Sequence, residues 1–296
     1  KRHALYCGFG EARGEVIVTV DSDSEVLTDT LKNLVAPLVY DANVGAVAGV
    51  VRVLNRKGPI PAMLDVSFTY AFDFIRASES VLGAVVCCPG ALSAYRRSLI
   101  DEVKDEWMEQ TVFGRPANIG EDRALTNQVL RRGLRVELQS TALVFTKVPT
   151  RFRGLWKMLL RWARSNARET FMLGRFVFRR FRRDHLTAIR LLFTHHALTM
   201  LVAGILFPCT LVAVALQPSI LLWIALTSLL VATVPAAVYA TRRQPQNCLW
   251  GFAYGLLSAF ATSWITPWAL ITPHRTGWLT RGPGRPLKQP RGLTAA

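Results

Sequence analysis

Two acidic motifs about a hundred residues apart are the strongest candidates for chemistry. Asp21-Ser22-Asp23 directly follows residues 15–20, a β-branched run, so both carboxylates stand where a strand is expected to end. Carboxylates on alternate residues can hold one divalent ion, Mg²⁺ or Mn²⁺, against a diphosphate. A turn after a strand also favours Asp and Ser without any function, so the motif alone leaves both interpretations open.

The second motif, Gly120-Glu121-Asp122-Arg123, precedes a helical run over residues 124–130. A carboxylate at a helix start meets the partial positive charge of the helix, which favours the ionised form. A capping Asp needs no function. A metal-type Asp pair, a second acidic motif and then apolar segments instead suit an inverting sugar transfer, in which Asp122 is the general base and a metal-bound diphosphate departs.

The elements around these motifs indicate an α/β sheet domain, because short β-rich runs alternate with helical stretches through residues 1–150. Strands are expected at residues 15–20, 45–53 and 84–88, and a helix at residues 60–82, where apolar side chains recur at helical spacing. Polar ligands of such sheets bind beyond the carboxyl ends of strands, where Asp21 and Asp23 lie.

Charge is distributed very unevenly along the chain. Residues 1–150 hold 17 basic and 18 acidic side chains, whereas residues 151–296 hold 19 basic and 2 acidic ones. No carboxylate side chain follows Asp184, so acid–base or metal chemistry of carboxylate type belongs to the first part. The net charge of +16 is not interpreted as a nucleic-acid signal, because the basic side chains lie beside apolar segments and no recognised binding module appears.

Three apolar stretches dominate the second part, at residues 197–216, 220–240 and 248–271, and none contains a charged side chain. Each is long enough to cross roughly 30 Å of hydrocarbon. A water-soluble protein would need three helices that are apolar all round, so the sequence predicts a membrane protein. Basic residues precede the first stretch and follow the second, which predicts a hairpin with both ends in the cytoplasm. The third stretch contains Pro267 and is predicted to be bent or re-entrant.

Residues 151–185 carry eleven basic and two acidic side chains beside an apolar stripe. This pattern predicts one or two interfacial amphipathic helices attracted to anionic lipid, with a solvated basic helix as the alternative. The chain is therefore expected to comprise a cytoplasmic sheet domain (1–150), basic interfacial helices (151–185), a transmembrane region (186–273) and a basic cytoplasmic tail (274–296).

Four motifs occur in an order that resembles one enzyme group: Asp21-Ser22-Asp23, residues 87–96 (CCPGALSAYR), residues 120–127 (GEDRALTN) and residues 161–165 (RWARS). Together they resemble the membrane-embedded processive family 2 glycosyltransferases, namely hyaluronan synthases and the related nodulation-type chitooligosaccharide synthases. Residues 1–6 and 276–281 also match. The resemblance implies a multi-pass protein of the inner membrane that transfers sugar from a UDP-sugar to a growing β-linked, hyaluronan-like polysaccharide and exports it. A chitooligosaccharide-forming N-acetylglucosaminyl transferase is the alternative.

The resemblance also implies roles for individual residues. Asp122 would be the catalytic base, and Asp21 and Asp23 would hold Mg²⁺ or Mn²⁺ with the donor diphosphate. The remaining residues would contact the donor (Lys1, Arg2, Arg161, Trp278 and Arg281, the last two in a gating segment) or the acceptor (Gly90, Glu121 and Trp162). An aromatic face for a sugar and a guanidinium for phosphate suit these tasks.

Two departures from the family pattern affect these expectations. The family's Gln-Gln-x-Arg-Trp appears as Met158-Leu159-Leu160-Arg161-Trp162, so both glutamines are apolar and an inactive membrane scaffold is a further alternative. The family's nucleotide-binding strand and first membrane helices would precede Lys1. The expected fold is therefore a family 2 sheet domain without its N-terminal part, which would bind a nucleotide sugar poorly.

Overall fold

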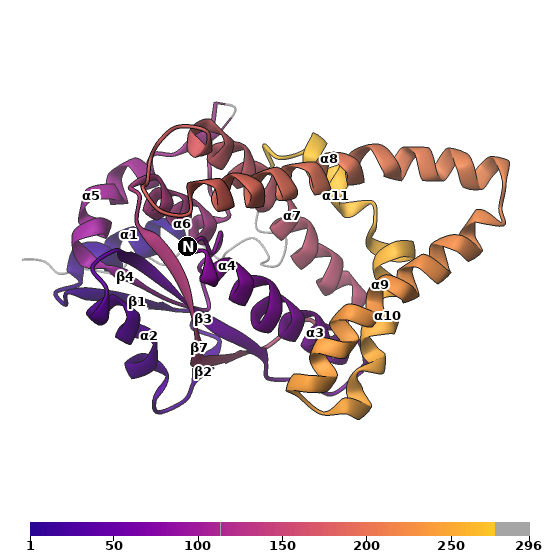
Figure 1. Ribbon diagram of the computed structural model, residues 1–296, viewed down its shortest axis with the longest axis horizontal. Coiled ribbons are helices and arrows are strands. Elements are labelled where there is room, and N and C mark those ends of the chain that lie inside the picture. Colours follow the sequence, from indigo (N-terminus) through magenta and orange to yellow (C-terminus); the bar gives the residue numbers. More distant parts are fainter. Residues whose placement is uncertain (113, 276–296) are drawn as a thin grey trace, which may run out of the picture.

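The protein is described by a computed structural model over residues 1–112 and 114–275 (Figure 1). Its first part contains a mixed five-stranded sheet with the order β1-β4-β3-β7-β2. The strands are β1 (Val16–Val20), β2 (Ser24–Val26), β3 (Val44–Val53), β4 (Leu92–Arg96) and β7 (Arg135–Thr146), with a separate pair formed by β5 (Thr111–Val112) and β6 (Arg115–Pro116). Strands β3 and β7 run parallel, and the other neighbours in the large sheet are antiparallel.

Helices cover both faces of this sheet. They are α1 (Arg2–Glu11), α2 (Thr30–Tyr40), α3 (Pro59–Tyr70), the π-helical η1 (Ala71–Arg76), α4 (Ala77–Val81), α5 (Arg97–Met108) and α6 (Glu121–Arg131). One core cluster joins the sheet to α1, α5 and α6, and a second joins it to α2 and α3. All ten residues of β3 are buried, as expected for a central strand covered on both faces.

The predicted strands at residues 15–20 and 45–53 are confirmed, and the predicted helix at residues 60–82 appears as α3, η1 and α4 in succession. The predicted strand at residues 84–88 is wrong. Only Ala84 forms a bridge, to Val136. Val85 N–H still donates to the carbonyl of Val136 at 3.1 Å, but beyond it Val86 N–H donates to Glu79 Oε2 and Cys88 N–H donates to Thr126 Oγ1. This irregular backbone leads into the Pro89-Gly90 turn.

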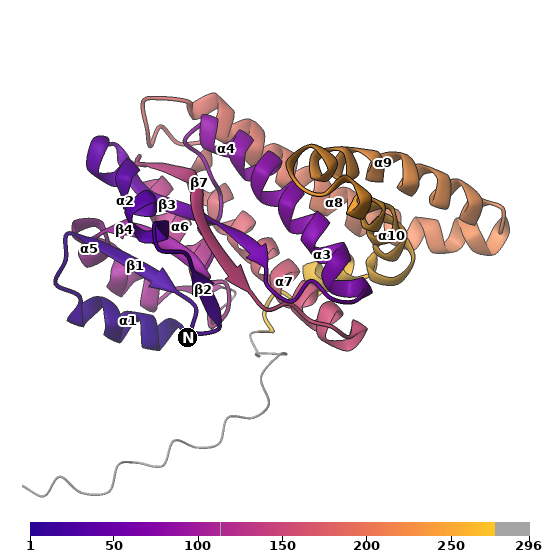
Figure 2. The same ribbon diagram turned by 90° about the horizontal axis from the view of Figure 1, so that it is seen from below.

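The second part is built from long helices. They are α7 (Phe152–Val177), α8 (Leu186–Leu216), α9 (Ile220–Arg242), the short 3₁₀ turn η2 (Pro245–Asn247), α10 (Leu249–Leu257), the π-helical η3 (Ser258–Thr262) and α11 (Ile265–Ile271). Helices α8 and α9 are long and apolar enough to span a membrane. Figure 2 shows them extending together away from the sheet domain.

The third apolar stretch is bent, as predicted. The segments Pro245–Thr262 and Ile265–Ile271 meet at an angle of 45°. Its re-entry, as opposed to a complete crossing, stays a prediction. The proposed tail beyond residue 275 lies outside the described residues.

Helix α7 is one continuous helix that packs between the sheet domain and the membrane-type helices. It contacts α6, α8 and α11, and its Leu160 packs with Ile265 and Ala269. The expectation that its whole basic stripe faces lipid is wrong for Arg164 and Arg168, which are buried. Their guanidinium groups find acceptors inside the protein, since Arg164 Nε donates to Thr272 Oγ1 at 3.1 Å and Arg168 donates to the carbonyl of Ile119.

Candidate active site

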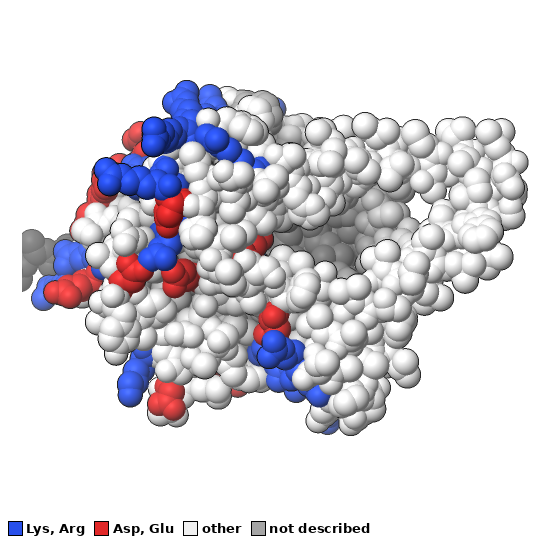
Figure 3. All heavy atoms as spheres, viewed as in Figure 1, with Lys and Arg blue, Asp and Glu red and all other residues white. Residues whose placement is uncertain are grey.

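A large cavity of about 1470 Å³ lies between the sheet domain and the membrane-type helices. Both acidic motifs line one end of it, and side chains of α8, α9 and η3 line the other. Figure 3 shows the molecule hollowed between its charged part and the uncharged arms formed by α8 and α9. One continuous space therefore joins the carboxylates to the apolar helices.

The two acidic motifs converge through the side chain of Lys1. Its Nζ atom lies 2.6 Å from Asp21 Oδ1 and 3.1 Å from Glu121 Oε1. Burial acts to lower the pKa of Lys1, but the charges of Glu121, Asp21 and Asp122 outweigh it and raise the pKa. Lys1 is therefore a permanently charged link between the end of β1 and the start of α6.

Asp122 is held at the first turn of α6. Its Oδ1 accepts the N–H of Arg123 at 2.8 Å, and its Oδ2 accepts the N–H of Gly90 at 3.3 Å. Burial, followed by the negative charge of Glu121, raises the pKa of Asp122. These effects outweigh the stabilisation of the ionised form that the helix start alone led us to expect. A carboxylate with a raised pKa is a stronger base when it is ionised.

Gly120 determines how close this turn comes to α7. Its φ is +74°, in the left-handed region, and a Cβ atom there would overlap the Ser165 hydroxyl and lie 2.8 Å from Ser165 Cβ. Only glycine meets both conditions at once. The close approach of α6 and α7 places Asp122 on the same cavity wall as Arg161 and Trp162.

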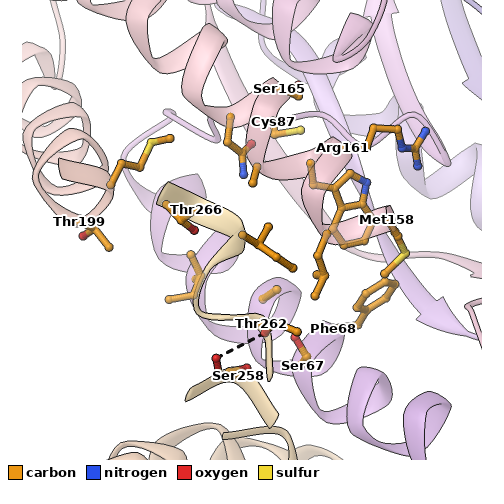
Figure 4. Close-up of a pocket in the computed structure, with 18 of the residues that line it drawn as sticks. Ser67, Phe68, Cys87, Met158, Arg161, Ser165, Thr199, Ser258, Thr262 and Thr266 are labelled. Atoms are coloured by element: carbon orange, nitrogen blue, oxygen red, sulfur yellow. Dashed lines mark hydrogen bonds between the residues drawn. The ribbon is translucent and has the colours of Figure 1, made fainter. Parts of the chain in front are cut away.

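Aromatic and basic side chains line the cavity next to the carboxylates. Trp162 is 39% exposed, and its ring centroid lies 6.0 Å from that of Phe68. Arg161 precedes it on α7, and Figure 4 shows Arg161, Met158 and Phe68 among the side chains around this pocket. An exposed aromatic face beside a guanidinium can accept a sugar ring next to a phosphate.

Most of the predicted site residues meet at this cavity. The residues that line it are Lys1, Asp21, Asp23, Gly90, Glu121, Asp122, Arg161 and Trp162. Arg2 is placed differently from the expectation of a nucleotide contact. It is 5% exposed, and its Nη1 donates to the carbonyl of Trp107 at 2.8 Å, because α1 turns this side chain toward α5. Trp278 and Arg281 lie outside the described residues.

Sequence reasoning missed a buried ionic cluster behind the cavity wall. Glu169 of α7 is 0% exposed, and it accepts hydrogen bonds from Asn127 Nδ2 at 3.0 Å and Gln110 Nε2 at 3.2 Å. The charge of Arg168 is the strongest of those that act on the Glu169 carboxylate, and removing one member of a buried ion pair costs about 3–5 kcal/mol. The sequence does contain one signal for this residue, because Glu169 is one of only two carboxylates after residue 150, within an otherwise basic segment.

Asp21 and Asp23 suit a divalent ion whose remaining ligands come from the substrate. Within the described ranges no group of three or more His, Cys, Asp or Glu side chains is arranged to hold a metal. Asp21 and Asp23 supply two oxygen donors at the cavity mouth. Mg²⁺ is typically bound by one or two carboxylates together with phosphate oxygens and water, so this pair suits an ion that arrives with a diphosphate.

The sheet fold, the paired carboxylates and the attached apolar helices define a glycosyltransferase domain joined to membrane-type helices. The chain belongs to Glycosyl transferase family 21, which matches residues 1–272.

Individual relatives agree with this class. The chain is 36% identical over 173 residues to an N-acetylglucosaminyltransferase of Rhizobium meliloti, covering 58% of this chain and 40% of that protein. It is 29% identical over 283 residues to an N-acetylglucosaminyltransferase of Neorhizobium galegae, covering 95% and 64%. It is 30% identical over 283 residues to a hyaluronan synthase of Streptococcus pyogenes, covering 95% and 66%. The chain therefore spans less than two thirds of the length of these relatives.

A solved structure shares the fold. It is a mannosyltransferase of Pyrobaculum calidifontis in complex with GDP-Man and Mn²⁺, with a TM-score of 0.54 and 22% sequence identity. The similarity covers 88% of this chain and 67% of that one. At this identity the likeness shows the fold alone.

Proposed function

We propose that the protein is a processive inverting glycosyltransferase that moves sugar from a UDP-sugar to a growing β-linked, hyaluronan-like polysaccharide and passes the product across the membrane. The observation that carries this proposal is the single cavity that contains both acidic motifs and continues between the membrane-type helices. The relatives named as an N-acetylglucosaminyltransferase and a hyaluronan synthase support sugar transfer, and the GDP-Man complex of the mannosyltransferase supports a nucleotide-sugar donor for this fold.

The chemistry follows from the placement of the carboxylates. Asp122 takes the proton of the acceptor hydroxyl as that oxygen attacks the anomeric carbon, and inversion follows from attack opposite the departing diphosphate. Asp21 and Asp23 would hold Mg²⁺ or Mn²⁺, and such an ion would neutralise charge on the diphosphate. Arg161 adds positive charge near the phosphates, and Trp162 offers its face to a sugar ring.

Acceptor contacts come from the wall around Asp122. Gly90 lines the cavity without a side chain, where an added Cβ would lie 2.5 Å from Lys1 Nζ, and Glu121 lies beside the base, held by Lys1. A polysaccharide that leaves this wall meets Thr199 and Thr210 of α8 and Thr262 of η3, so hydroxyl groups accompany the apolar lining. The UDP-sugar, the growing chain and an anionic lipid membrane are the partners in this proposal, which includes no nucleic acid.

We place the sheet domain in the cytoplasm of a multi-pass inner-membrane protein. Helices α8 and α9 supply two candidate spans, and the bent third segment would cross or re-enter. Arg242 ends α9 and Arg243 follows it, whereas the link between α8 and α9 carries no charged side chain. The positive-inside rule then places both ends of this hairpin on the cytoplasmic side.

The two apolar replacements in α7 are compatible with an intact site. Met158 is 7% exposed and belongs to the core cluster that contains Leu155, and Leu159 packs partly against the same core. Both side chains thus contribute to packing and also line the cavity, together with the carboxylates, Arg161 and Trp162. This arrangement favours an active transferase over an inactive scaffold.

The donor requirement tests the proposal and its main alternative. Membranes with the full-length protein are expected to form a long polymer only when UDP-N-acetylglucosamine and UDP-glucuronic acid are both supplied, as mass spectrometry of the product would show. Short oligomers from UDP-N-acetylglucosamine alone would instead establish the chitooligosaccharide activity, which the rhizobial relatives favour. No turnover of any UDP-sugar would contradict both and support the scaffold.

The pH dependence of transfer tests the role of Asp122. The base must be ionised, so the rate is expected to decrease as the pH falls through the pKa of Asp122, which is raised above its ordinary value of 3.8. Glu121→Gln removes a negative charge that raises this pKa, so the acidic limb of the pH–rate profile is expected to move to lower pH.

The matched control for this shift is Glu102→Gln, which removes one negative charge from α5, where Glu102 pairs with Arg132. Its acidic limb is expected to coincide with that of the unsubstituted protein. An acidic limb that does not move in Glu121→Gln would show that a group other than Asp122 controls it.

A further inference from the structure

A second cavity, of about 480 Å³, lies where α3, α9 and α10 meet. Its size falls within the range of about 300–1,000 Å³ that is typical of small-molecule pockets. Its lining includes Arg56, Asp65, Tyr239, Arg242, Arg243 and Trp250. Figure 3 shows basic side chains gathered between α3 and α10. The transfer chemistry proposed above uses none of these residues.

The lining of this pocket carries an excess of positive charge. Three guanidinium groups, those of Arg56, Arg242 and Arg243, face a single lining carboxylate, that of Asp65. Asp65 is 3% exposed, and its Oδ2 already accepts the hydroxyl of Tyr239 at 2.7 Å. Its Oδ1 lies 3.6 Å from Arg56 Nε, a long ion pair. One carboxylate therefore leaves about two positive charges of the pocket without a counter-charge.

A buried N–H group at this place lacks a hydrogen-bond acceptor. Arg243 Nε is buried and has no hydrogen-bond partner in the part of the chain that the structure describes. Burial, followed by the charges of Arg52 and Arg56, lowers the pKa of Arg243. An N–H group that is buried without an acceptor costs free energy. A bound anion would supply both the acceptor and the missing negative charge.

The pocket also lies at the boundary of the apolar helices. Arg242 ends α9 and Arg243 follows it, whereas Leu230 and Val231 earlier in α9 are 70% and 71% exposed. Trp250 of α10 lines the same pocket, and tryptophan is enriched at the interface between membrane and water. A phosphate group at the level of lipid headgroups could therefore reach these guanidinium groups.

We propose that this pocket is a binding site for a phosphate-bearing anion, with the headgroup of an anionic phospholipid as the source that its position favours. Guanidinium groups bind phosphate oxygens through paired, charge-assisted hydrogen bonds. Basic pockets between membrane helices on the cytoplasmic side bind such headgroups. The site is separate from the cavity of Asp122, so the binding proposal can be tested independently of the proposed function.

The test compares lipid binding by the full-length protein and its Arg56→Gln/Arg243→Gln variant. Each is reconstituted in phosphatidylcholine vesicles with increasing phosphatidylglycerol, and the lipid retained per protein is measured by mass spectrometry after exchange into detergent. Saturable retention of phosphatidylglycerol is expected for the unsubstituted protein. The affinity of the variant is expected to be at least about tenfold lower, because each basic side chain near an anionic surface contributes about 1 kcal/mol. A parallel arm replaces phosphatidylglycerol by inorganic phosphate and measures protection against thermal unfolding.

The matched control is Arg13→Gln/Lys32→Gln, which removes two exposed charges from the sheet domain, and its retention is expected to equal that of the unsubstituted protein. Loss confined to the pocket variant supports the site. Protection by inorganic phosphate without retention of phosphatidylglycerol supports the phosphate site and assigns it to a soluble anion. Equal affinities of the pocket variant and the unsubstituted protein, for both phosphatidylglycerol and inorganic phosphate, would overturn the proposed binding site. Should the double variant fail to fold, Arg242→Gln, whose side chain is exposed, provides the same comparison.

Discussion

Asp122→Asn is expected to abolish sugar transfer while the protein remains folded and still binds its donor. The substitution preserves the size of the side chain but removes the group that takes the acceptor proton, which typically reduces a rate by about 10²–10⁴-fold. Polymer formation from UDP-sugars by membranes with the full-length protein would measure the loss, and binding of labelled UDP would confirm that the donor site persists.

Asp122→Asn is not expected to destabilise the fold at neutral pH. The pKa of Asp122 is raised in the folded protein, so stability linked to its protonated form is present below the unfolded pKa and is lost as the pH rises through the folded pKa. At neutral pH the ionised carboxylate is therefore a cost that asparagine removes. A thermal unfolding midpoint well below that of the unsubstituted protein would show that lost activity reflects misfolding.

The control for this experiment is Asp101→Asn. Asp101 lies on α5, where it is exposed and pairs with Arg97 and Lys104. Its replacement is expected to leave the transfer rate unchanged. Polymer synthesis by Asp122→Asn at more than a tenth of the unsubstituted rate would rule out Asp122 as the base.

Gly120→Ala is expected to inactivate the protein through its structure. Alanine at a φ of +74° costs about 1–2 kcal/mol. The added methyl group would also overlap Ser165, and overpacking of this kind costs about a further 1–3 kcal/mol. Helix α6 can relieve the overlap only by moving away from α7, which carries Asp122 with it. The thermal unfolding midpoint and the transfer rate are both expected to fall.

Two further variants separate strain from overlap. Gly114 has a similar φ of +72°, and no described atom lies within 4 Å of its added Cβ, so Gly114→Ala is expected to show the strain alone. Adding Ser165→Gly to Gly120→Ala removes the overlapping side chain and is expected to restore part of the stability. Equal losses in Gly114→Ala and Gly120→Ala would contradict the role of close helix packing.

The sequence predicted those features that depend on local signals. The strand before Asp21, the strand at residues 45–53 and the helical run at residues 124–130 each have a clear pattern of residues, and the structure confirms all three, although α6 begins earlier than expected, at Glu121. The apolar stretches were equally clear, because nothing but length and composition determines whether a helix can span a membrane.

Other features depend on contacts between distant residues and could not be predicted. Arg168 has the same helical spacing as the exposed Arg175 on α7, yet it is buried because the carbonyl of Ile119 and the charge of Glu169 lie against it. Arg2 is adjacent to Lys1, but α1 turns the two side chains toward different surroundings. Residues 84–88 have a strand-like composition, but the side chains of Glu79 and Thr126 accept the amide protons of Val86 and Cys88, so the pairing with β7 does not extend beyond Val85.

The seam between Leu160 of α7 and the bent segment, through Ile265 and Ala269, has a practical consequence. Arg161 and Trp162 directly follow Leu160, so the helix that presents them is anchored on its other face by a membrane-type segment. A shortened chain that ends after α7 would expose the apolar surface around Leu160 to water, and α7 could then change its position relative to the sheet domain. Enzymology on a detached catalytic half would therefore report a distorted donor pocket, and lipid nanodiscs that contain the complete protein are the appropriate preparation.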